Sequence, residues 1–204
     1  FFPAKHTGLL WQLVVREVQQ RFRGSWLGLG WSIVTPLGML MVYTFVFRTV
    51  LNARWPGAPD SNTEFALQVF SGLLIFTLFS DVIGRASNLV VDQPNLVKKV
   101  IFPLEILPWV NIFSVFFHSC FSLLVLVAGV AIMRDGLTFH VLSVPLILVV
   151  FLPMLLGLSW LLSALGVYVR DVSHVVGLVL TPLLFLSPVF YPASALPEVV
   201  QQFI

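Results

Sequence analysis

The sequence predicts an all-α membrane protein, a polytopic helical bundle, and three observations lead there. Of the 204 residues, 58% are hydrophobic and only 10% are charged, whereas soluble domains carry about 25% charged residues. Four apolar runs are uncharged and about 20 residues or longer, the length that crosses a bilayer, and a fifth, Phe65–Ser80, is shorter and continues through Asp81 and Arg85. These runs lack the alternation of a membrane-spanning strand. With a mean hydropathy of +0.99, the chain could not bury its apolar surface in one water-soluble core.

Composition also excludes several classes of function. The net charge of +2 is small and scattered, which argues against nucleic acid as a partner. The single cysteine, Cys120, excludes a disulfide scaffold. No lysine follows a glycine, so there is no phosphate-binding P-loop, and there is no His/Cys cluster with metal-ligand spacing and no G-x-S-x-G. We therefore predict no catalytic residue, no metal site and no cofactor in this chain. If the chain moves a solute uphill, the energy must come from a partner.

The first predicted element is an amphipathic helix over residues 5–23 that lies in the headgroup layer of the membrane. Its apolar face carries Trp11, Val14, Val15, Val18 and Phe22, at the spacing of one helical face. Two interpretations remain open, an interfacial anchor and a docking surface for a cytoplasmic partner. The basic residues assigned to this helix are Arg16, Arg21 and Arg23.

Five membrane spans follow. They are predicted at 26–50, 65–87, 105–133, 141–169 and 173–191. Lys and Arg residues are enriched in cytoplasmic segments, and placing the N-terminus in the cytoplasm gives the clearest asymmetry. The inner side then holds Lys5, Arg16, Arg21, Arg23, Arg85, Lys98, Lys99 and Arg170. The outer side holds Arg48, Arg54 and Arg134.

The longest inner loop, 88–104, is moderately apolar, is interrupted by Pro94 and ends at Pro103, and contains the basic pair Lys98 and Lys99. A loop of this kind suits contact with a groove on another protein. A role as a basic membrane anchor is an equal alternative, and the two are compatible.

Polar residues within the predicted spans are few. Asp81 and Arg85 stand four apart on one predicted helix, so they are expected to neutralise one another. His118 lies in mid-span and is expected to bond to a neighbouring helix rather than relay protons.

Aromatic residues are frequent in the spans, and their faces can line a path for sugar rings. Ordinary packing is the competing explanation at each position. The residues assigned to a translocation path are Phe70, Phe76, Phe117, Trp160, Phe190 and Tyr191.

Four tracts in order give the chain a family resemblance. The tracts are R-G-S-W-L-G-L-G-W-S-I-V-T-P-L at 23–37, N-L-V-K-K-V-I-F-P-L-E-I-L-P at 95–108, V-Y-V-R-D-V at 167–172 and S-P-V-F-Y-P at 187–192. Together they resemble ABC-2-type permeases that export surface polysaccharides such as O-antigen, capsule or teichoic acid.

The resemblance implies a permease subunit of the bacterial plasma (inner) membrane that pairs with a second copy of itself and with two ABC ATPase subunits. ATP and Mg are then used by those subunits. A lipid-linked polysaccharide passes through a channel between the two permease copies. The family has six spans, so we expect this chain to be trimmed at both ends, with 192–204 beginning short outer helices. The expected ATPase coupling residues are Asn95, Leu96, Val97, Lys98, Lys99, Val100, Ile101, Phe102 and Pro103.

Two alternatives stay open. One is an ABC-2-type exporter of drugs or small lipids, and the other, with less support, is a membrane enzyme of glycan assembly. The enzyme would need charged residues clustered at one membrane face, which this sequence does not show.

Overall fold

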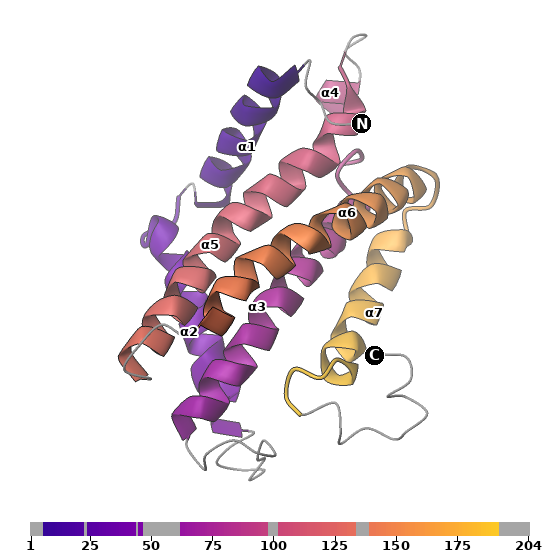
Figure 1. Cartoon of the computed structure of the whole chain (residues 1–204). Helices are drawn as coiled ribbons and strands as arrows, with labels where there is room; N and C mark the ends of the chain where they lie inside the picture. Colours follow the sequence, from indigo (N-terminus) through magenta and orange to yellow (C-terminus); the bar gives the residue numbers. More distant parts are fainter. Residues whose placement is uncertain are drawn as a thin grey trace.

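The computed structural model describes residues 6–22, 24–43, 45–46, 62–97, 102–133 and 139–191. All regular secondary structure in these ranges is helical (Figure 1), which confirms the predicted all-α class. The α-helices are α1 (Thr7–Phe22), α2 (Trp31–Tyr43), α3 (Asn62–Ala86), α4 (Pro94–Val97), α5 (Leu107–Met133), α6 (Phe139–Tyr168) and α7 (Val172–Leu186). Short 3₁₀ helices, Gly28–Gly30 and Leu104–Ile106, precede α2 and α5.

Three long helices, α3, α5 and α6, form the centre of the bundle (Figure 1). Within the described ranges, the segments Phe65–Ala86, Leu104–Ile132 and Ser143–Tyr168 are long and apolar enough to cross a membrane. Aliphatic side chains fill the space between these helices, and the most completely buried are Leu78, Val82, Ile112, Val115 and Leu155. The helices α2 and α7 are apolar but shorter, so the count of five spans stays a prediction.

Large apolar side chains also cover the outside of the bundle. Met41 on α2, Val150 on α6 and Leu178 on α7 are 75%, 72% and 76% exposed. Exposed apolar surface of this extent marks a protein that faces lipid or a partner. It agrees with an integral membrane protein.

The helix α7 ends at Leu186, earlier than the predicted span 173–191. Ser187 is extended (φ −74°, ψ 143°), as expected for a residue that precedes a proline. The chain then turns back, and Val189 and Phe190 pack on α3 against Phe65 and Val69. The correction follows from Pro188, which disfavours helical geometry in the residue before it.

The helix α1 packs on the 3₁₀ helix Leu104–Ile106 and the first turn of α5 through Leu10 and Val14, which contact Ile106 and Val110. The apolar face predicted from the sequence is therefore only partly the packed one, because Trp11 is 65% exposed. Val14 and Val18 pack against protein, whereas Trp11 and Val15 are exposed. The side chain of Phe22 lies outside the described residues. The apolar side chains of α1 are therefore divided between a face that packs on protein and a face that is exposed.

Candidate functional site at the α1 end of the bundle

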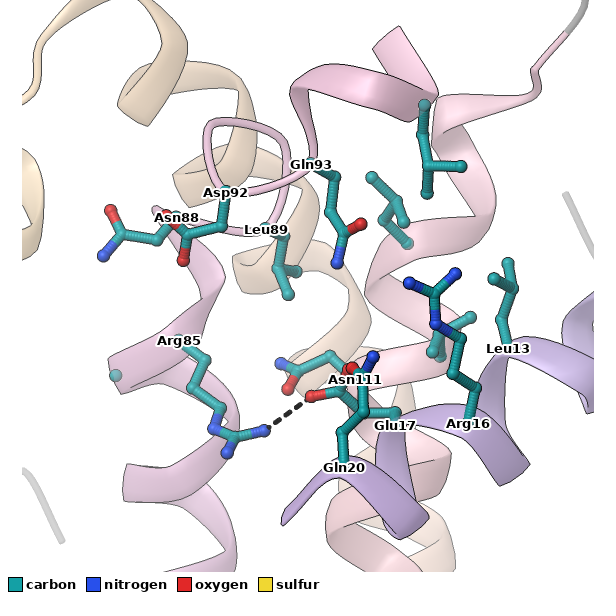
Figure 2. A pocket seen from close by; sticks show the side chains of 14 residues that line it. Leu13, Arg16, Glu17, Gln20, Arg85, Asn88, Leu89, Asp92, Gln93 and Asn111 are labelled. Atoms are coloured by element: carbon teal, nitrogen blue, oxygen red, sulfur yellow. Dashed lines mark hydrogen bonds and ion pairs between the residues drawn. The ribbon is translucent and has the colours of Figure 1, made fainter. Parts of the chain in front are cut away.

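A polar pocket of about 320 Å³ lies where α1, the end of α3, the turn that follows it, α4 and the start of α5 meet (Figure 2). It brings the two segments that the sequence analysis proposed for docking, the interfacial helix and the inner loop, into one site. Arg16 and Gln20 line it from α1, Asn88 and Asp92 from the turn, and Asn111 from α5.

Two ion pairs fasten α1 to α3 beside this pocket. Arg85 Nη1 lies 3.0 Å from Glu17 Oε1, the contact drawn in Figure 2, and Arg21 Nη2 lies 3.1 Å from Asp81 Oδ2. The predicted pairing of Asp81 with Arg85 is therefore wrong. Each of the two residues bonds to α1 instead, because α1 crosses the end of α3 and offers an oppositely charged partner to each.

Asn111 occupies the floor of the pocket and is only 2% exposed. Its Nδ2 donates a hydrogen bond to the carbonyl oxygen of Val82, at 3.0 Å, which fixes α5 against α3. Its Oδ1 is buried and accepts no hydrogen bond from the described part of the chain. A buried acceptor without a donor is costly. The site therefore favours a group that brings an N–H or O–H into the pocket.

The formal charges that line the pocket cancel, since Arg16 and Arg85 face Glu17 and Asp92. The remaining polar lining is mostly amide, from Gln20, Asn88, Gln93 and Asn111. No group of His, Cys, Asp and Glu that could hold a metal ion occurs among the described residues. A pocket of amides and balanced charges suits recognition of a polar protein surface.

Five of the nine predicted coupling residues lie among the described residues, and one of them is next to this site. Asn95, Leu96 and Val97 belong to the short helix α4, and Leu96 lines the pocket. Phe102 and Pro103 lead into the 3₁₀ turn before α5. Lys98, Lys99, Val100 and Ile101 lie outside the described residues, as does Arg23 of the interfacial helix.

The structure places the six predicted path residues in different surroundings. Phe70 and Phe190 are buried between helices, at 3% and 2% exposure. Trp160 Nε1 donates to the carbonyl oxygen of Glu105, and the Tyr191 hydroxyl donates to the carbonyl oxygens of Phe185 and Leu186.

Phe117 is 42% exposed on α5 and lies edge-on to Phe121, and Phe76 lines a second pocket, between α2, α3 and α5. Phe70 lines this second pocket as well, and Phe190 packs on α3. A path along the six residues stays a prediction.

The sequence analysis missed Glu17 and Asn111. A signal for Glu17 was present, because Glu17 and Arg21 stand four apart, as do Asp81 and Arg85. Two such acid–base pairs on neighbouring helices are complementary when the helices run in opposite directions, since each acid then meets the base of the other pair. Asn111 carries no comparable signal, since a single amide in an apolar run is compatible with many roles.

Comparison with known proteins identifies the family to which the chain belongs. The model of the ABC-2 type transporter family matches residues 8–204. The chain belongs to the ABC-2 type transporter family. This ABC-2 chain is 33% identical to the O-antigen export system permease protein RfbA of Myxococcus xanthus, over 95% of the chain and 72% of the relative. It is 24% identical to the protein of that name in Klebsiella pneumoniae, over 94% of the chain and 73% of the relative. It is also 22% identical to the polysialic acid transport protein KpsM of Escherichia coli, over 91% and 70%.

The family assignment confirms the resemblance drawn from the four tracts, and all of them lie within the matched region. As an ABC-2 type transporter protein, the chain is an integral membrane protein whose relatives are named as transport permeases. The pocket at the α1 end is thus a feature of a transporter membrane domain.

Proposed function

We propose that this chain is the permease subunit of an ATP-driven exporter that moves a lipid-linked polysaccharide across the bacterial plasma membrane. Two copies form the channel at their interface, and each copy engages an ABC ATPase subunit that binds ATP and Mg. The N-terminus is cytoplasmic, so the α1 end of the bundle faces the ATPase subunits.

The observation that carries the proposal is the pocket shared by α1 and the loop that follows α3. A contact that transmits movement must touch elements that are joined firmly to the spans. Here the loop continues into α5, and α1 is held to α3 by the Glu17–Arg85 and Arg21–Asp81 ion pairs. The names of the relatives support a polysaccharide as the cargo.

The mechanism then needs no catalytic group in this chain. Closure of the ATPase subunits on ATP pushes on the pocket and on α4, and α3 and α5 carry the movement into the membrane. Nucleotide shifts the permease from one conformation to the other by as much as its binding free energy differs between the two conformations. The glycan is bound loosely, since a polymer has to slide through the channel.

Reversing the charge of the basic pair, with Lys98→Glu and Lys99→Glu together, is expected to reduce co-purification of the ATPase subunit by about tenfold. The reason is that several opposed charges at an interface change its affinity by about a kilocalorie per mole or more. The double variant should still insert in the membrane at the wild-type level. Arg134→Glu, which lies on the predicted outer side, is the matched control and should leave co-purification unchanged. Normal association of the double variant would reject the coupling assignment.

The export function itself is tested by locating the lipid-linked glycan in cells that lack this protein. Export after synthesis predicts that polymer accumulates on the cytoplasmic side while the surface is bare. Polymer missing from both sides would instead indicate an enzyme of glycan assembly. A normal surface would indicate an exporter of small molecules.

A further inference from the structure

A second pocket, of about 330 Å³, opens at the surface of the helical bundle of a single chain, between α2, α3 and α5, with Leu184 of α7 at its edge. Its polar lining is unusual for a membrane domain because it consists mostly of hydroxyl groups from three different helices. These come from Ser32, Thr35, Thr77, Ser80, Ser119 and Ser122. Aromatic rings of Trp31, Phe70 and Phe76 form other parts of its wall.

Several of these hydroxyls are available to a ligand. The Ser119 hydroxyl donates to the carbonyl oxygen of Val115, and Ser32 Oγ lies 3.2 Å from His118 Nδ1 in a hydrogen bond that joins α2 to α5. By contrast, the side chains of Thr35, Thr77, Ser80 and Ser122 make no hydrogen bond within the described ranges. Ser and Thr in membrane helices ordinarily bond to a backbone carbonyl of their own helix or to a neighbouring helix.

The formal charges in this pocket are already neutralised. Among the described residues that line it, the guanidinium is that of Arg21 and the carboxylate is that of Asp81, and the two form the ion pair that links α1 to α3. An added anion would have to compete with Asp81 for Arg21, and an added cation would have to compete with Arg21 for Asp81. A neutral ligand with many hydroxyl groups avoids both costs, because it exchanges hydrogen bonds with water for hydrogen bonds with the lining.

We infer that this pocket binds a neutral sugar unit of the transported glycan within one permease copy. Hydroxyl groups on three helices supply donors and acceptors around a ring, and Trp31 and Phe76 supply flat apolar surface for its less polar faces. The volume falls at the lower end of the range of about 300–1,000 Å³ for small-molecule sites, so the pocket suits a short piece of a chain. The inference rests on the proposed function for the origin of the sugar. It goes further in naming the residues of one copy that bind the sugar and in excluding acidic sugars from the pocket.

The test uses the full-length protein with its partner subunits in lipid nanodiscs, and methyl mannoside and N-acetylneuraminic acid as neutral and acidic probes. Saturation-transfer NMR is expected to show contact for the neutral probe and none for the acidic one. Ser122→Phe fills the pocket and should abolish the signal. Leu124→Phe is the matched control, because it adds the same ring to the same helix at a position that is 64% exposed. Thr77→Val, which removes one hydroxyl and keeps the shape, should weaken binding about three- to tenfold.

Equal signals for the two probes would overturn the assignment to neutral sugars. A neutral signal that survives Ser122→Phe, or no signal in the wild type, would overturn the site. Failure of this inference is separable from failure of the proposed function. Suppose that cells lacking the protein accumulate glycan inside, whereas cells that carry Ser122→Phe display normal surface glycan. This result would reject the sugar site in the pocket and would still support the export function.

Discussion

Gly166→Ala is expected to destabilise the protein by about 2 kcal/mol, which for a chain of this length lowers the apparent Tm by about 5 °C. Gly166 lies near the end of α6, where the helix touches the turn after α3. A Cβ at this position would overlap the carbonyl oxygen of Ser87 and lie 2.8 Å from its carbonyl carbon. Since the obstacle is backbone and Ser87 is only 1% exposed, one of the two elements has to move.

The matched control is Gly157→Ala on the same helix, where an added Cβ meets nothing within 4 Å. Alanine favours helix over glycine by about 1 kcal/mol, so this variant should be as stable as the wild type or slightly more stable. Thermal unfolding of both variants in one detergent, followed by size-exclusion chromatography, measures the difference. Equal melting temperatures for the two variants would show that α6 does not approach the turn this closely.

Arg85→Glu is the second change with a large expected effect. It replaces a 3.0 Å ion pair with two opposed carboxylates, that of Glu17 and that of the introduced side chain, at the junction of α1 and α3. The side chains of Arg85 and Glu17 are 39% and 32% exposed, so the cost should lie between that of a surface pair and that of a buried pair, at about 2 kcal/mol. We expect α1 to separate from α3, the folded yield to fall and surface glycan to be reduced.

The reciprocal change restores the attraction. Glu17→Arg combined with Arg85→Glu is expected to recover most of the yield and stability lost in the single variant. Gln19→Glu, on the exposed face of the same helix and outside the pocket, should alter stability by less than about 0.5 kcal/mol. If the double variant is as defective as Arg85→Glu alone, the two residues do not act as a pair.

Much of the fold could be predicted because the membrane constrains the sequence directly. Backbone groups in lipid need hydrogen-bond partners, which a helix supplies within its own segment, so a long apolar run without strand alternation is expected to be helical. The predicted spans at 65–87, 105–133 and 141–169 accordingly match α3, α5 and α6 within a few residues. The end of α7 was misplaced because apolar residues continue past Pro188, and hydropathy does not register where a chain turns back on its neighbour.

The site could be predicted only in part. The sequence identified the interfacial helix and the inner loop as candidate docking segments, and the structure brings residues of both into one pocket, with Arg16 on one wall and Leu96 on another. The predicted apolar face of α1 divides in the structure, since Val14 packs on protein while Trp11 and Val15, which are also apolar, are exposed. Periodicity alone does not distinguish an apolar face that meets protein from one that meets lipid.

The sequence by itself determined that this is an all-α membrane protein, since hydropathy and charge depend on composition along the chain. The four tracts, in their order, indicated the family. The tertiary structure decided which charges pair, with Arg21 bound to Asp81 and Arg85 bound to Glu17. It also decided which hydroxyls share a pocket. These are relations between segments up to about ninety residues apart, such as Ser32 and Ser122. They depend on the rotation and crossing of helices, which are fixed by side-chain packing rather than by any local pattern.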